Sequence, residues 1–153
     1  QGLEGWIEVG GGGRTDASPA AAAVGTYMFI AAKGPGPTGD IGINQTGDLG
    51  QTFTGWSSAN FSTDVAPAVA AAGNYVFFFA KHPDGRIFYN RAKLGQGLEG
   101  WIEVGGGGRT NASPAAAAVG TYMFVAIKGL DGNIYINQTG DLGQTFLTWD
   151  LLK

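Results

Sequence analysis

The strongest constraint on how this chain folds is an internal repeat. Residues 1–29 return at 96–124 with one difference, Asp16 against Asn111. A weaker copy lies between them, and tryptophans at positions 6, 56, 101 and 149 mark a period of 45 to 50 residues. Such a period indicates a stacked or radial array of one small structural unit. We therefore treat the chain as a single segment with three repeats, approximately 6–55, 56–100 and 101–149.

Each repeat predicts four short strands. In the third repeat they are WIEV at 101–104, SPAAAAV at 113–119, TYMFVAIK at 121–128 and IYINQ at 134–138. Aromatic and β-branched residues favour strands, and a DG turn separates the last two segments. A helix is the alternative for the alanine run, because Ser-Pro-Ala resembles a helix start. The Gly-Thr that follows would end such a helix after about five residues, too short for stability.

We predict an all-β protein of three four-stranded antiparallel β-propeller blades, since four strands per repeat of this length are typical of a blade. The alanine strand is expected innermost in its blade, and the WIEV strand outermost in the blade before it. Three blades cannot close a ring, because propellers have about four to eight. We therefore expect a homo-oligomer, most simply a dimer with six blades. One of the two outer strands at Trp6 and Trp149 is then displaced, or the chain is a piece of a longer propeller.

Composition argues against several classes of protein. The formal charge is −3 with only nine Lys and Arg, which argues against nucleic-acid binding. There is no cysteine, and His82 is the one histidine, so we expect no disulfide, no metal site and no cofactor. No apolar run approaches the roughly 20 residues that span a bilayer, and no membrane insertion is expected. The compartment stays open between secretion and the cytoplasm.

A turn motif, TGDLGQTF, occurs at 46–53 and again at 139–146. An Asp carboxylate can accept N–H bonds across such a turn, and Gly permits a left-handed backbone. The motif resembles the Asp-box of sialidases and related propellers. That resemblance implies a folding staple between the third and fourth strands, so Asp48 and Asp141 are expected to be structural.

The rest of the repeat, from GWIEVGGGGRT through PAAAA to NIYINQ, resembles the blade of Photorhabdus-type propeller lectins. The likeness covers repeats one and three over nearly their whole length. It is looser in the middle repeat, where SSANFSTDVAPAV replaces the glycine loop. The resemblance implies binding of fucose-type and O-methylated sugars in shallow sites between adjacent blades.

Sugar recognition needs an aromatic platform with amide or guanidinium donors beside it. Each outer repeat offers a tryptophan, an arginine after the glycines and an asparagine at the end of the IYIN strand. The tryptophans can instead pack between blades, and the asparagines can cap a turn. Tyr135 aligns with Phe88 and Gly42, so we do not expect equivalent sites. The candidate sugar-binding residues are Trp6, Arg14, Asn44, Trp56, Asn90, Trp101, Arg109, Tyr135, Asn137 and Trp149.

An enzyme is the competing interpretation. Sialidase-type hydrolysis needs clustered arginines, a tyrosine nucleophile and carboxylates. Arg14 and Arg109 occupy one position of two different repeats, and every glutamate lies in a copy of LEGWIEV. We therefore expect no enzyme and no catalytic residue, but a multivalent lectin whose partners are fucosylated or methylated glycans and a second copy of itself. The alternatives are a ligand-free or engineered repeat scaffold and a sialidase-like glycosidase fragment.

Overall fold

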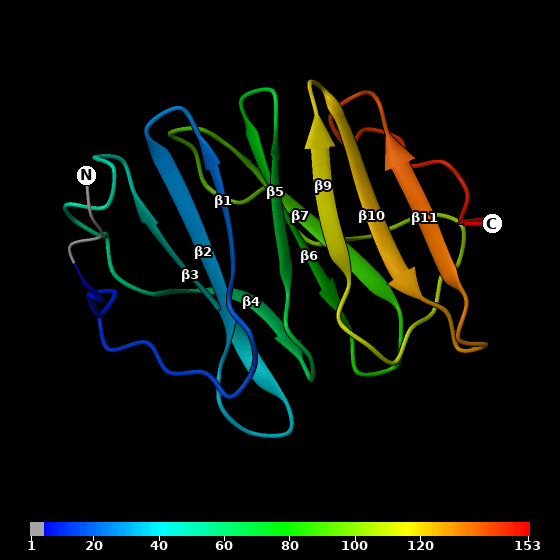
Figure 1. Ribbon diagram of the computed structural model, residues 1–153, viewed down its shortest axis with the longest axis horizontal. Coiled ribbons are helices and arrows are strands. Elements are labelled where there is room, and N and C mark those ends of the chain that lie inside the picture. The colour runs from blue at the N-terminus through cyan, green and yellow to red at the C-terminus, as the bar shows by residue number, and fades with distance from the viewer. Residues whose placement is uncertain (1–4) are drawn as a thin grey trace.

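The computed structural model describes residues 5–153 and consists of three four-stranded antiparallel sheets that follow one another along the chain (Figure 1). No helix occurs in this range. The predicted fold class, a set of propeller blades, is confirmed. The strands of blade 1 are β1 (Ala20–Val24), β2 (Tyr27–Lys33), β3 (Gly39–Thr46) and β4 (Ser57–Thr63); those of blade 2 are β5 (Ala68–Ala72), β6 (Tyr75–Lys81), β7 (Ile87–Lys93) and β8 (Ile102–Glu103); those of blade 3 are β9 (Ala115–Val119), β10 (Tyr122–Lys128), β11 (Ile134–Thr139) and β12 (Asp150–Leu151).

The alanine runs form β1, β5 and β9, which lie side by side along the middle of the molecule (Figure 1). Each is the first strand of its sheet, and the sheet then runs outward in chain order to β4, β8 or β12. Methyl side chains let these inner strands approach closely where the blades converge. The strand prediction for the alanine run is therefore right, and the helix alternative is excluded.

The second copy of WIEV is the outer strand of the preceding blade, as predicted. Ile102 pairs with Tyr89 of β7, and Val104 is buried at 1% exposure. The same prediction is wrong for the first copy at 6–9, where Trp6 and Ile7 are 105% and 79% exposed. The two segments are identical, so the partner makes the difference. Residues 6–9 have no β7-like edge beside them among residues 5–153.

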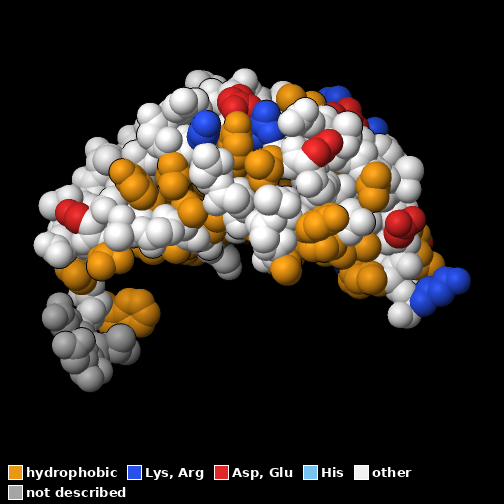
Figure 2. All heavy atoms as spheres, turned by 90° about the horizontal axis from the view of Figure 1, so that it is seen from above, with side chains coloured by type: hydrophobic (Ala, Val, Ile, Leu, Met, Phe, Trp, Pro, Cys, Tyr) orange, Lys and Arg blue, Asp and Glu red, His pale blue; other side chains and the backbone are white. Residues whose placement is uncertain are grey.

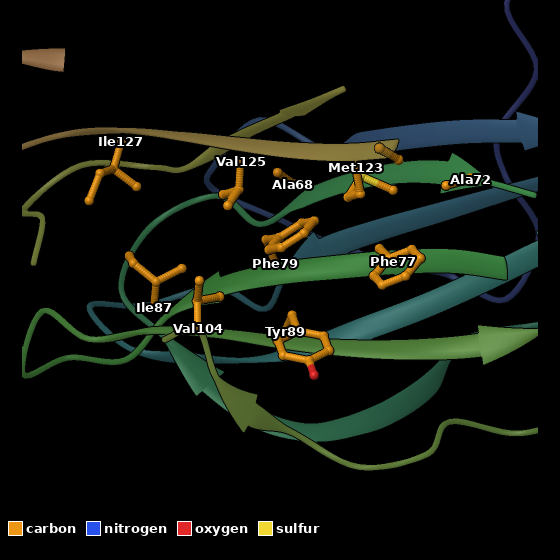
Figure 3. Packing of buried hydrophobic residues seen from close by; sticks show 11 residues of the cluster. Ala68, Ala72, Phe77, Phe79, Ile87, Tyr89, Val104, Met123, Val125 and Ile127 are labelled. Atoms are coloured by element: carbon orange, nitrogen blue, oxygen red, sulfur yellow. The ribbon is translucent and has the colours of Figure 1, made fainter. Parts of the chain in front are cut away.

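Two hydrophobic clusters join the blades. Between blades 2 and 3, Phe77 and Phe79 of β6 pack against Met123 and Val125 of β10 (Figure 3). Between blades 1 and 2, Phe78 packs with residues of β1, β2 and β3. Strand β6 is buried on both faces because a blade lies on each side of it. Blade 2 is thus the centre of an arch, which Figure 2 shows with hydrophobic side chains in separate patches across the face in view and at the hollow edge.

The TGDLGQTF turns connect β3 to β4 and β11 to β12. In the first, the Asp48 carboxylate accepts the backbone N–H and the hydroxyl of Thr52 at 2.9 and 2.6 Å, and the hydroxyl of Thr46 at 2.7 Å. These hydrogen bonds lower the pKa of Asp48 to about 2, and those from Thr52 have the largest effect. Hydrogen bonds from Thr139 and Thr145 likewise hold the pKa of Asp141 well below its ordinary value. Both carboxylates are thus occupied by their own turns.

Candidate functional site

Two pockets lie at the same place in repeats one and three. Pocket 1 has a volume of about 570 Å³ and is lined by Arg14, Ala32 and Trp56 among others. Pocket 2 has a volume of about 440 Å³ and is lined at the corresponding positions by Arg109, Ile127 and Trp149. Each pocket lies where a glycine loop crosses the indole at the start of an outer strand. The repeat has therefore built one kind of concave surface twice.

Glycine is required where the loop crosses the indole. A side chain at Gly13 would overlap the ring of Trp56, and one at Gly108 would overlap the ring of Trp149. Two residues earlier, Gly11 and Gly106 have φ of +93° and +85°, a conformation that side chains rarely adopt. The glycines thus allow backbone to lie directly on the indole, and that contact shapes one wall of each pocket.

The hydrogen bonding of the indole N–H group differs between the outer repeats and the middle repeat. The Nε1 atoms of Trp56 and Trp149 are buried and have no hydrogen-bond partner. The Nε1 of Trp101 donates to the carbonyl of Ala59 at 2.8 Å. A buried donor without an acceptor costs about 1–3 kcal/mol. Repeats one and three therefore keep a costly arrangement that the middle repeat avoids.

The middle position is filled by Phe61, which sequence reasoning missed. The middle repeat lacks the glycine run, and Phe61 of β4 packs where the other repeats have a glycine. Its ring centroid lies 4.5 Å from that of Trp101 and 5.3 Å from that of Phe88. Trp101, a predicted sugar-binding residue, therefore belongs to the packing between blades 1 and 2. The signal for this was the replacement of glycine by an aromatic residue in the alignment of the repeats.

Tyr135 makes the two pockets different, as the alignment predicted. Its ring lies against Gly129, and its hydroxyl donates to Asp131 Oδ2 at 2.8 Å. Hydrogen bonds from Asn133 and then Tyr135 lower the pKa of Asp131, and the carboxylate in turn raises the pKa of the Tyr135 phenol. Gly42 takes this position in pocket 1 and lies against Trp56. Pocket 2 therefore carries a polar rim at this position, whereas pocket 1 extends over Ala21 and Ile30 and is the larger of the two.

The charged residues of the pockets lie at their edges. Arg14 is exposed and lines pocket 1, together with the carboxylates of Glu8 and Asp40. Arg109 of pocket 2 contacts Glu103 at 3.3 Å, and its side chain is 40% exposed. Both arginines thus stand where a bound molecule would meet a guanidinium at the rim. Glu8, Asp40 and Asp131 are pocket residues that sequence reasoning did not select.

The three candidate asparagines are buried and bonded to backbone. Asn44 donates to the carbonyl of Gly10 at 3.0 Å, and Asn137 donates to that of Gly105 at 3.0 Å. Asn90 accepts the N–H of Gly100 at 3.0 Å. The three residues are 1–2% exposed, and Asn44 also lines a third pocket, of about 210 Å³, together with Phe29 and Phe78. Asn44 and Asn137 hold the glycine loop, and Asn90 holds the segment that leads to the outer strand.

Trp6, another candidate, is fully exposed and lines neither pocket 1 nor pocket 2.

Residues 5–153 contain no group of three or more His, Asp or Glu side chains that could hold a metal ion. They also contain no helix long and apolar enough to cross a membrane.

No protein-family model and no curated protein matches this chain. Among solved structures it resembles Bacteroides ovatus xyloglucan PUL GH43B, with a TM-score of 0.59 and 13% sequence identity. That match covers 90% of this chain and 30% of the other. The GH43 protein BlXynB of Bacillus licheniformis matches with a TM-score of 0.40 and 10% identity, over 86% of this chain and 41% of the other. The chain thus spans less than half the length of either protein, and the first likeness shows a shared fold.

This likeness corrects one expectation. From the sequence we expected no enzyme, yet the Bacteroides protein bears the name of a GH43 glycoside hydrolase and shares the fold of this chain. The absence of a sialidase arrangement of arginines and glutamates excluded one chemistry and not the whole class. The expectation of no enzyme is therefore withdrawn.

Proposed function

We propose that this chain binds carbohydrate in pockets 1 and 2. The observation that carries the proposal is the double construction of one pocket, each time with glycine backbone laid on an indole whose N–H is left unpaired. An arrangement that costs stability and is kept at two equivalent places, while the middle repeat fills the same place with Phe61, is typical of a functional surface.

The residues around the pockets match what a sugar presents. A pyranose has an apolar face and a rim of hydroxyl groups. In pocket 1 the apolar wall is Trp56 with Ile30 and Ala32, and Arg14 supplies donors at the edge. In pocket 2 the wall is Trp149 with Ile127, and the edge carries Arg109 and Asp131. Planar guanidinium and carboxylate groups can bond neighbouring hydroxyls in pairs.

The sugars we propose are fucose-type or O-methylated. Their methyl groups are apolar, and Trp56 and Ala32 give pocket 1 an apolar lining for them. Pocket 2 is narrowed by Tyr135 and bounded by Asp131, which favours a ligand with a free hydroxyl at that edge. The proposal is also supported by the likeness of repeats one and three to Photorhabdus-type lectin blades.

Two pockets on one rigid arch give multivalent binding. Shallow sugar sites bind weakly one at a time, and linked sites can raise the apparent affinity by about 10²–10⁴ on a glycan-coated surface. We therefore expect retention on dense glycan surfaces to be much stronger than binding of a free monosaccharide.

A glycan array with fucosylated and O-methylated glycans tests this function. We expect retention of the folded chain, reduced by Trp149→Ala and by Trp56→Ala and lost in the double variant. Trp6→Ala is the matched control, because Trp6 is exposed and lies outside both pockets. Absence of any signal on a broad array, with protein shown to be folded by circular dichroism, would reject the proposal.

Glycoside hydrolysis is the second candidate function. It is favoured by the fold shared with a GH43 protein and by two carboxylates, Glu8 and Asp40, that line pocket 1. Glycosidases use a pair of carboxyl groups on either side of the bond they cleave. Asp40 also accepts the backbone N–H of Phe61 at 3.2 Å, which fixes one oxygen. Release of the aryl group from aryl glycosides, abolished by Glu8→Gln and by Asp40→Asn, would establish this activity.

A further inference from the structure

One face of blade 3 is exposed although it has the side chains of a buried face. We define the leading face as the side of blade 3 turned away from blade 2, which presents Val119, Phe124 and Ile134. The same position is occupied by isoleucine in all three blades: Ile41 is 0% exposed, Ile87 is 1% exposed and Ile134 is 45% exposed. Val119 is 71% exposed. The two buried isoleucines are each covered by the blade that follows.

Blade 1 shows what covers such a face. The residues of blade 1 that correspond to the leading face pack against β5, β6 and β7 of blade 2. They are the same or nearly the same residues, because repeats one and three share their sequence here. The covering surface is therefore the side of another blade. The matching residues of blade 1 are Ala20, Ala22, Val24, Phe29, Ala31 and Ile41.

Blade 1 also has an exposed face, which corresponds to the side of blade 3 that packs against blade 2. We define the trailing face as the side of blade 1 turned away from blade 2, with Ala21 and Ala23 of β1 exposed on it. In blade 3 the corresponding alanines, Ala116 and Ala118, pack against blade 2. Leu49, at the rim of the trailing face, is 77% exposed. Its counterpart Leu142 packs against blade 2, where its carbonyl accepts a hydrogen bond from Arg91.

We propose that a second copy of this chain docks head to tail, with the leading face of one copy on the trailing face of the other. Each open face is then covered by the kind of surface that covers its counterpart within the chain. Two such contacts related by a two-fold axis close a ring of six blades, within the range that propellers adopt. Closure also removes apolar sheet faces that soluble proteins rarely leave exposed.

The second copy would also complete pocket 1. Ile127, which lines pocket 2, belongs to one hydrophobic cluster with Ile87 and Val104 of blade 2. In pocket 1, Ala32 takes the place of Ile127, and Ile134 of the second copy would take the place of Ile87. The docked copy would cover Ala21 and Ile30 of pocket 1, because their counterparts Ala116 and Val125 pack against blade 2. It would leave the part of pocket 1 at Arg14, Gly42 and Trp56 that corresponds to pocket 2. Pocket 1 is then a site walled by two chains, and this consequence rests on the proposed sugar binding. The assembly itself does not.

Light scattering after size exclusion, over a range of protein concentrations and without sugar, tests the assembly. We expect a mass of twice 15.7 kDa. Val119→Glu should give the monomer, because it places a charge in the leading face. Leu130→Glu is the matched control: Leu130 is 68% exposed but lies in the turn between β10 and β11, and this variant should stay dimeric.

A monomer at every concentration, or a dimer that Val119→Glu leaves intact, would overturn the docking. Circular dichroism shows whether the variant is folded, and Ala117→Glu on the same face repeats the test at a second position. Sugar titration of the Val119→Glu monomer separates the two proposals. Pocket 2 should bind as in the parent chain and pocket 1 more weakly; no binding in either the parent chain or the variant would reject sugar binding while leaving the assembly result unchanged.

Discussion

The backbone of Gly108 lies directly on the indole of Trp149, so that a side chain at Gly108 would overlap the ring. Gly13 has the same relation to Trp56 in the first repeat. These contacts explain why the loop is a run of glycines, and they place the indole and the following arginine beside one pocket. In the middle repeat, Phe61 packs on Trp101 at the place where the outer repeats have a pocket.

Gly108→Ala should lower stability and remove binding at pocket 2 only. The added methyl must displace the Trp149 ring or the loop, and overpacking of this kind costs about 1–3 kcal/mol. Gly105→Ala in the same loop is the control, because the nearest atoms to its added methyl are 3.8 Å away. Chemical denaturation measures both. Equal stability of the two variants would contradict the close packing of Gly108 on Trp149.

Phe61→Gly should open a third pocket beside Trp101. Removing the ring takes away the group that fills the middle position, at a cost of about 3 kcal/mol for a large aromatic side chain. Sugar should then perturb the fluorescence of Trp101, which it leaves unchanged in the parent chain. Phe61→Leu, which keeps the space filled, should show no such response. A folded Phe61→Gly variant that gains no response would show that an open pocket is not sufficient for binding.

Acid should weaken the fold through the two TGDLGQTF turns. Folding lowers the pKa of Asp48 from 3.8 to about 2, so its stabilising effect is complete above the unfolded value and is lost as pH falls toward 2. The pKa of Asp141 is lowered in the same sense. Melting temperatures should therefore fall between about pH 4 and pH 2. The Asp48→Asn, Asp141→Asn double variant should melt lower at neutral pH and depend less on acid.

The control for the acid experiment is Asp150→Asn, an exposed carboxylate outside both turns. It should keep the pH dependence of the parent chain. If the double variant showed the same acid sensitivity as the parent, the stability lost in acid would come from other groups.

Asn137→Ala should loosen the glycine loop without touching a ligand. The substitution removes the hydrogen bonds that Asn137 donates to the carbonyl of Gly105 and accepts from the N–H of Gln138, at a cost of about 0.5–1.5 kcal/mol each. Hydrogen exchange of the Thr110 N–H, which follows the glycine loop and donates to the carbonyl of Gly85 at 3.0 Å, should become faster, and binding at pocket 2 should weaken in proportion to that opening. Asn133→Ala, at an exposed position in the next turn, should leave the exchange rates unchanged. Slow exchange in Asn137→Ala would contradict the positioning role.

The repeat period and the residue types of each strand were enough to predict the sheets. Small alanines indicated the inner strand, and WIEV indicated the outer strand of the preceding blade, because both depend on local composition. The first WIEV could not be placed in this way. Its sequence is identical to the second, and only the neighbouring strand decides whether it pairs.

The candidate site could be predicted in part. The tryptophans and arginines of the outer repeats were selected as side chains that sugar binding would need, and the structure places Trp56, Trp149, Arg14 and Arg109 in the lining of the two pockets. The asparagines were selected for their amides, but those amides bond the backbone. Burial is a property of the packed blades, which spacing along one strand does not reveal.

The most direct test of the account is fluorine NMR of the chain labelled with 5-fluorotryptophan, titrated with an O-methylated methyl fucoside. The four tryptophans give four resonances, assigned by single Trp→Phe substitutions. The account predicts that the resonances of Trp56 and Trp149 move with ligand concentration while those of Trp6 and Trp101 stay in place. Movement confined to Trp6 or Trp101, or no movement at all in the folded chain, would contradict it.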